Sequence, residues 1–146
     1  MGAHLLAAAY DGDGSHTPSR DQTSLRVIYR FSGFLQPIDN LPTVNLGKAG
    51  RTYPVKWQLQ DAAGAYLSQL SAVQSILQKK VDCSNFSSNP TDAIEAGSAG
   101  NSSLRYDAAA NQFVYNWQTP TTAGCYVLFL TLDDGQTYQA NFDLRK

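Results

Sequence analysis

Large apolar side chains recur at every second position along several stretches of the chain. In residues 53–60 they alternate with polar side chains, which places the two kinds on opposite faces of a strand. Pro54 cannot donate a hydrogen bond to a sheet, so it belongs at the start of this strand or on a sheet edge. Residues 113–118 and 138–145 repeat the alternation. The pattern therefore predicts three strands.

Residues 125–132 are almost all apolar, which is typical of a strand covered on both faces. Asp134 and Gly135 follow, and an Asp-Gly pair supplies the positive φ of a tight turn. We therefore expect a hairpin over residues 125–144. Shorter strand patterns cover residues 25–31, 43–46 and 103–107. Many short strands at this spacing predict an all-β antiparallel sandwich.

Two stretches depart from the strand pattern. In residues 67–80 the apolar positions are spaced as one helical stripe, but a short apolar run does not distinguish a helix from a strand. Both alternatives stay open for this segment. Residues 84–101 are rich in Ser, Asn, Gly and Ala, and we interpret them as a long surface loop.

Composition favours a single domain that works outside the cell. The chain has 146 residues, enough for one core, and only 16% of them are charged, against about a quarter in an average protein. Abundant Ser, Thr, Asn, Gln and Gly suit the strands and turns of a secreted or cell-surface sandwich. The net charge of −1 offers no basic surface for nucleic acid or for an anionic membrane.

The apolar run at residues 5–9 does not have the form of a signal peptide. It is short, no Lys or Arg precedes it, and it leads directly into an Asp-Gly-Asp-Gly sequence. No window of the sequence reaches the roughly 20 apolar residues of a membrane span. We therefore expect no membrane span, and an exported protein would carry its signal or anchor elsewhere on a longer parent chain.

Cys83 and Cys125 are the two cysteines of the chain. A structural zinc site needs four ligands, and His4 and His16 are distant in sequence. A disulfide is therefore favoured over a pair of reduced thiols, and it suits an oxidising compartment. In the loop-entropy model such a crosslink contributes about 4 kcal/mol to stability.

Residues 49–59 resemble the signature of the PxKF domain, in which an Ala-Gly turn leads into Pro-x-Lys-Phe and an apolar strand. The matching motif residues are Pro54, Val55, Lys56 and Trp57. Trp57 stands where the family usually has Phe. Further similar blocks follow in order at residues 104–107, 113–117, 119–126 and 132–135. The resemblance covers about residues 29–146 and implies an immunoglobulin-like accessory domain of secreted or surface-attached bacterial proteins, without known catalytic residues.

Residues 1–28 resemble a different protein class, the last two strands of a bacterial immunoglobulin-like repeat. Residues 2–13 are similar to the penultimate strand and its turn, and residues 23–28 to the final strand. This resemblance implies that the chain begins inside one domain of a tandem array. Neighbouring immunoglobulin-like domains of a parent chain would then be its partners.

We expect these first residues to form a two-stranded hairpin that joins Ala3–Tyr10 to residues 23–30. An isolated hairpin is marginally stable in water. It would therefore dock on the main sandwich, pair with another chain or stay mobile. The apolar residues available for docking are Phe31, Phe34, Leu35 and Ile38.

A search for metal sites finds one partial match. Asp11, Asp13 and Ser15 mimic the start of a calcium loop, but His16 stands where that loop needs Gly and Gln22 where it needs a bidentate Glu. A plain acidic turn is the favoured interpretation. We expect no metal ion and no cofactor.

A search for catalytic groups gives no nucleophile with its base. Ser98 lacks the flanking glycine spacing of a nucleophile elbow. Neither His4 nor His16 has a nucleophile and an acid nearby in sequence. Lys56, the candidate for a Lys-to-Asn amide crosslink, falls on the polar face of its strand. We expect that the protein is not an enzyme.

Residues 122–126 resemble the tyrosine corner of immunoglobulin folds, in which a Tyr two residues after Gly bonds back to the preceding loop. Tyr126 takes the corner position. In that pattern the cysteine of the inter-sheet disulfide comes two residues after the Tyr, which here is Leu128. Cys125 has the opposite parity along the strand, so it faces away from the core.

The parity of Cys125 predicts where the disulfide lies. Val127 and Phe129 share its outward face, whereas alternate residues from Tyr126 onward face the core. We expect Cys83 to reach the rim or outer face of the sandwich and to fix the start of the 84–101 loop over Val127 and Phe129.

Two classes of function remain for this module. One is a structural spacer or presentation module, and the other is an adhesion module that binds a carbohydrate or a protein. Aromatic rings gathered in one concave patch favour carbohydrate stacking, and scattered rings favour a spacer. The rings that decide between them are Tyr66, Phe86 and Tyr106.

Overall fold

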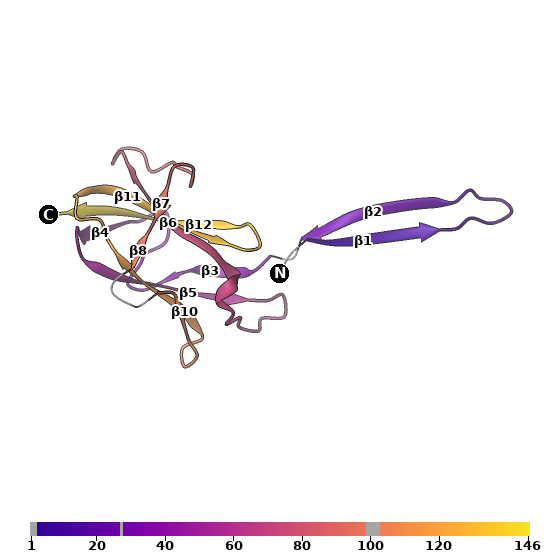
Figure 1. Ribbon diagram of the computed structural model, residues 1–146, viewed down its shortest axis with the longest axis horizontal. Helices are drawn as coiled ribbons and strands as arrows, with labels where there is room; N and C mark the ends of the chain where they lie inside the picture. The colour runs from indigo at the N-terminus through magenta and orange to yellow at the C-terminus, as the bar shows by residue number, and fades with distance from the viewer. Residues whose placement is uncertain (1–2, 27, 99–102) are drawn as a thin grey trace.

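The computed structural model describes residues 3–26, 28–98 and 103–146, and shows two packed β-sheets and a separate hairpin (Figure 1). The hairpin consists of β1 (Ala3–Tyr10) and β2 (Ser19–Arg26). The first sheet contains β3 (Arg30–Leu35), β5 (Thr52–Gln60) and β10 (Gln112–Gln118), with β8 (Gly97–Ser98) and β9 (Arg105–Asp107) both paired to β10. The second contains, in order, β4 (Val44–Lys48), β12 (Thr137–Arg145), β11 (Gly124–Leu132), β6 (Val73–Val81) and β7 (Ile94–Glu95). The predicted all-β sandwich is confirmed.

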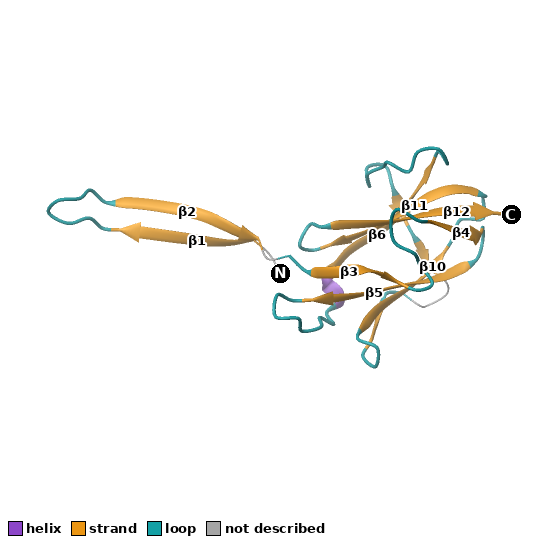
Figure 2. Cartoon of the chain, turned by 180° about the vertical axis from the view of Figure 1, so that it is seen from behind, coloured by secondary structure: helices purple, strands orange, loops and turns teal. Residues whose placement is uncertain are grey.

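The arrangement is immunoglobulin-like, with its first strand divided between the two sheets. β3 pairs antiparallel with β5 in the first sheet, and the chain then crosses to the second sheet, where β4 pairs with β12. The β4–β12 pair is parallel, whereas the other strand pairs of the described residues are antiparallel. Figure 2 shows the two sheets facing each other, with the hairpin beyond the end of β3.

The core lies between the sheets and follows the alternation along the strands. Val55, Trp57 and Leu59 of β5 are buried, and the Trp57 ring stacks on Phe113 of β10 with ring centres 5.6 Å apart. On β10, Trp117 spans the sandwich, and its indole Nε1 donates to Gln78 Oε1 of β6 at 2.7 Å. The Trp117–Gln78 bond is therefore a buried polar link between the two sheets.

Two-sided burial explains the continuous apolar run of β11. Tyr126, Leu128, Leu130 and Leu132 belong to the core between the sheets. Val127 and Phe129 lie outside that cluster, yet they are 0% and 1% exposed. The predicted parity of this strand is therefore confirmed.

A loop covers the outer face of the second sheet. Lys79 pairs with Val127 across β6 and β11, and its Nζ donates to the carbonyl of Thr91 at 2.7 Å. The segment after β6 thus folds back over the sheet. It includes the two-residue strands β7 and β8, so the expected loop over 84–101 carries some strand pairing. Its last three residues lie outside the described residues.

Residues 67–80 resolve into a single short 3-10 turn, Leu70–Ala72, followed by β6. The helical alternative for this segment was wrong. β6 pairs with nearly the whole of β11, from Val73 opposite Leu132 to Val81 opposite Cys125. Because the backbone groups of β11 need partners on this side, sheet pairing prevails over the helical spacing.

The N-terminal hairpin exists, but its second strand begins four residues earlier than expected. Tyr10 pairs with Ser19 and Ala3 with Arg26, so β2 is Ser19–Arg26 and not residues 23–30. A tight turn that joins Asp13 to His16 sets this register. The predicted strand over 25–31 is thereby divided, since Arg30 belongs to β3 and pairs with Gln60.

Candidate functional site

The chain enters the sandwich at an anchored position. Tyr29 is 6% exposed, and its backbone N–H donates to Asp134 Oδ2 at 2.7 Å. Asp134 lies in the β11–β12 turn, is itself buried, and also accepts from the N–H of Gln136. Burial first, and then the Asp133 carboxylate, raise the pKa of the Tyr29 phenol far above its ordinary value. The phenol therefore stays neutral, and residue 29 is fixed to the end of the second sheet.

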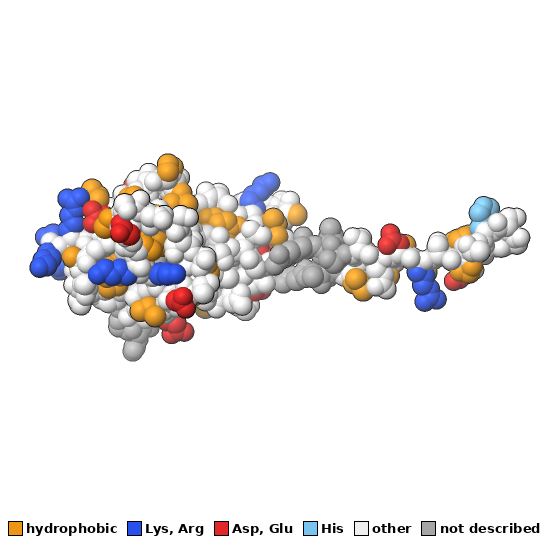
Figure 3. All heavy atoms as spheres, turned by 90° about the horizontal axis from the view of Figure 1, so that it is seen from above, with side chains coloured by type: hydrophobic (Ala, Val, Ile, Leu, Met, Phe, Trp, Pro, Cys, Tyr) orange, Lys and Arg blue, Asp and Glu red, His pale blue; other side chains and the backbone are white. Residues whose placement is uncertain are grey.

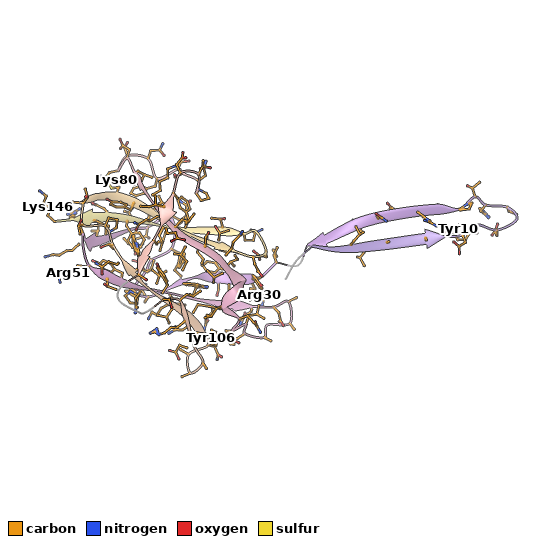
Figure 4. All side chains as sticks on the ribbon, in the orientation of Figure 1. Tyr10, Arg30, Arg51, Lys80, Tyr106 and Lys146 are labelled. Atoms are coloured by element: carbon orange, nitrogen blue, oxygen red, sulfur yellow. A yellow bond between two sulfur atoms is a disulfide. The ribbon has the colours of Figure 1, made fainter. Side chains whose placement is uncertain are left out.

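The chain leaves the sandwich at the opposite end. Figure 4 shows Arg30 beside the hairpin and Arg51, Lys80 and Lys146 together at the far end. Backbone bonds close this far end: Ala49 N–H donates to the carbonyl of Arg145 at 2.8 Å, and Gly50 N–H to that of Pro120 at 2.9 Å. The points at which the chain enters and leaves are therefore separated by the length of the sandwich.

The β1–β2 hairpin is uncovered on both faces. Leu5 and Leu6 point to opposite faces of β1 and are 66% and 55% exposed. Among the residues that the structure describes, both strands pair only with each other, and residues 5–23 are exposed apart from the partly buried Gly12. Figure 3 shows the hairpin as a narrow extension of the sandwich. Docking on Phe34 and Ile38 is not found, because these two side chains are already buried in the sandwich core.

The tip of the hairpin is a turn ordered by Asp13. Its Oδ1 accepts from the N–H groups of Ser15 and His16 at 2.8 and 2.9 Å, and its Oδ2 accepts from the Tyr10 hydroxyl at 2.8 Å. The Ser15 bond first, then those from His16 and Tyr10, lower the pKa of Asp13 to about 2. The carboxylate oxygens thus stabilise the turn itself, in keeping with an acidic turn.

A groove of about 390 Å³ lies between β3 and the start of β12. Phe31 and Tyr138 stack on one of its walls with ring centres 3.9 Å apart, and Phe34 meets Phe31 edge-on. The exposed Leu41 closes another side. The sequence pattern did not reveal this groove, because Phe31 and Tyr138 are 107 positions apart and each fits an ordinary strand alternation.

The three rings that were expected to distinguish the functions come from separate elements. Tyr66 lies in the β5–β6 connection, and Phe86 lies in the loop that follows β6 and Cys83. Tyr106 on β9 packs edge-on against Phe113 and bonds to Asn111. None of the three lines the groove between β3 and β12.

The disulfide joins Cys83 to Cys125, as expected from the sequence. Cys125 is buried at the start of β11, whereas Cys83 is exposed just after β6, so the bond links neighbouring strands of one sheet at its rim. It lies outside the core between the sheets. At the same corner, the Tyr126 hydroxyl donates to the Thr122 carbonyl at 2.9 Å, the bond expected of a tyrosine corner.

The Pro54–Trp57 motif lies in β5. β3 pairs with β5 from Gln60 to Lys56, and Pro54 lies beyond this pairing. The missing N–H therefore faces a stretch where β5 has no β3 neighbour, as the sequence predicts for a proline. Trp57 is fully buried, and its Nε1 has no hydrogen-bond partner.

The remaining candidates of the sequence are not brought together. Ser98 lies in β8 opposite Trp117, and His16 sits at the hairpin tip. His4 is in β1, but its side chain lies outside the described residues. Within the described part of the chain, no three His, Cys, Asp or Glu side chains gather as a metal site, and no helix is long and apolar enough to span a membrane.

Comparison with family models, curated proteins and solved structures gives no match for this chain. Its geometry therefore carries the functional argument.

Proposed function

We propose that the protein is a non-catalytic structural module, a spacer that holds the segments before and after it at a fixed separation and presents its N-terminal hairpin. The decisive support is the path of the chain. It enters beside Tyr29 and leaves after Arg145 at the far end, and the strands run along the axis between these points (Figure 1). A module with this path adds its own length to any chain that contains it.

Anchored ends support the same role. At one end Asp134 binds the backbone of Tyr29, and at the other Ala49 binds that of Arg145. Short hydrogen bonds at both connections restrict pivoting of the flanking segments. The disulfide adds a covalent link at the rim.

The setting that we propose is a secreted or cell-surface multidomain protein of a bacterium. The disulfide and the charge-poor sandwich suit an oxidising, extracellular compartment. The resemblance of residues 49–59 to the PxKF signature supports the same setting. Neighbouring immunoglobulin-like domains are the partners proposed for the hairpin, because β1 has the apolar pattern of a strand covered on both faces.

A second candidate function is adhesion through the groove between β3 and β12. Its stacked Phe31 and Tyr138 rings are the kind of surface on which a sugar ring or an apolar side chain packs. Binding of the unaltered protein and of Tyr138→Ala to a glycan array is the experiment that distinguishes adhesion from the spacer role. Binding that disappears in the variant would favour adhesion over the spacer.

Small-angle X-ray scattering of the monomer tests the spacer proposal. We expect an elongated particle whose maximum dimension shortens when residues 1–26 are deleted, while the circular dichroism of the sandwich is retained. A compact particle whose dimension is unchanged by the deletion would contradict a projecting hairpin and a spacer.

A further inference from the structure

β4, the strand that follows β3, and β12, the last strand of the sandwich, run in parallel. Residues Val44–Lys48 of β4 lie in register with Asn141–Arg145 of β12, and Ala49 N–H extends the ladder to the carbonyl of Arg145. β4 is reached from the end where the chain enters, and β12 leads directly to the exit. A force along the chain therefore acts on β12 at its last residue and, transmitted through β3, on β4 at its first residue.

Such a force loads the β4–β12 ladder in shear. The two strands are drawn past each other along their common axis, so all the hydrogen bonds between them are strained together. β3 is also pulled along its own axis against β5. Resistance is greatest in this geometry because no single bond can break before its neighbours are loaded.

The hairpin has the opposite geometry. Ala3 and Arg26 are partners at its open end, and the turn at Asp13–His16 closes the other end. Tension between these two partners separates the pairs one at a time, beginning at Ala3. The exposed faces of the hairpin add no packing that would delay this opening.

We propose that the sandwich bears tension along the chain, with the parallel β4–β12 pair as its mechanical clamp and the β1–β2 hairpin as a compliant element in series. This inference rests on the proposed spacer function, since only a module connected at both ends is pulled.

The direction of the N–H groups in β4 provides a matched pair of variants. Ala49 N–H points to β12, and strand alternation gives Asn45 and Gly47 the same direction. Lys48 N–H points instead to the Tyr53 hydroxyl at 2.7 Å, so Leu46 N–H also faces away from β12. Ala49→Pro therefore removes a clamp bond, and Leu46→Pro introduces the same ring without removing one.

The test is single-molecule force spectroscopy on the full chain, held by peptide tags at its two ends. We expect a low-force extension from the hairpin, and then one event at several times that force from the sandwich. Ala49→Pro lowers the force of the second event, and Leu46→Pro leaves it unchanged. Equal effects of the two variants would overturn the assignment of the clamp.

A second pulling direction tests the β4–β12 clamp even if Ala49→Pro does not fold. Arg51 is exposed and lies with Lys146 at the same end of the sandwich (Figure 4). Pulling between a reactive unnatural side chain at position 51 and the C-terminal tag peels β4 from β12, so we expect a much lower force. The same force in both directions would overturn the clamp, and the scattering test of the spacer would be unaffected.

Reduction of the disulfide supplies an independent readout. The bond closes a loop of 42 residue steps between Cys83 and Cys125, outside the β4–β12 pair. Reduction should increase the chain extension released in the second event by roughly 140–150 Å, at about 3.3–3.6 Å per residue. The force of that event should not change. A force that falls as far as it does in Ala49→Pro would place the resistance in β6 and β11 and contradict the proposal.

Discussion

The two buried tryptophans offer a matched test of the polar link between the sheets. Trp57 and Trp117 are both fully buried, but only Trp117 has a hydrogen-bond partner, Gln78 Oε1 at 2.7 Å. Trp→Phe at either site removes similar apolar volume. At position 117 it also leaves the buried Gln78 oxygen without its donor, which costs about 1–3 kcal/mol. At position 57 it removes an indole N–H that had no partner.

We therefore expect Trp117→Phe to lower the free energy of unfolding by about 1–3 kcal/mol more than Trp57→Phe. Urea unfolding followed by far-UV circular dichroism measures both, with similar m-values as the check that the unfolded states are comparable. Gln78→Leu completes a double-mutant cycle with Trp117→Phe and should show coupling of about 1 kcal/mol. Equal losses in the two tryptophan variants, together with zero coupling, would refute the account of this link.

Three further perturbations follow from the rim and the hairpin. Tyr126→Phe removes the bond to the Thr122 carbonyl and should cost about 1 kcal/mol in urea unfolding; no change would mean that the corner bond is replaced by water. Replacing Cys83 and Cys125 together by Ala opens a loop of 42 residue steps and should cost about 4 kcal/mol in the loop-entropy model, so a loss below about 1 kcal/mol would contradict that model here. The pKa of Asp13 is lowered from 3.8 to about 2, so its support of the turn is complete above pH 3.8 and is lost as the pH falls through about 2. Amide chemical shifts of Ser15 and His16 should follow this titration, and an unchanged profile in Asp13→Asn would argue against it.

The sheets of the sandwich were predictable because burial repeats along their strands. β5, β10 and β12 alternate, and β11 has the continuous apolar run of a strand covered on both sides. The outward parity of Cys125 was likewise enough to place the disulfide at the rim. In each case a local period of two residues reports directly on which face is buried.

Features that depend on partners distant in sequence were not predictable. The 67–80 segment carries a helical spacing, and only its pairing with β11 makes it a strand. The start of β2 was missed for a different, local reason, because the bonds of the Asp13–His16 turn set a register four residues away from the one that the apolar pattern indicates. The aromatic groove needs Phe31 and Tyr138 to meet from opposite ends of the sequence, and the parallel β4–β12 pair has no signal within either strand.

The central claim is that the chain enters and leaves the sandwich at opposite ends along a rigid path. Electron–electron double resonance tests it with unnatural spin-labelled side chains at the exposed positions Arg30 and Lys146, and with Arg51 and Lys146 as the same-end control (Figure 4). The account predicts a narrow, long distance for the first pair and a clearly shorter one for the control. A first-pair distance as short as the control, or one spread over the whole accessible range, would contradict the account.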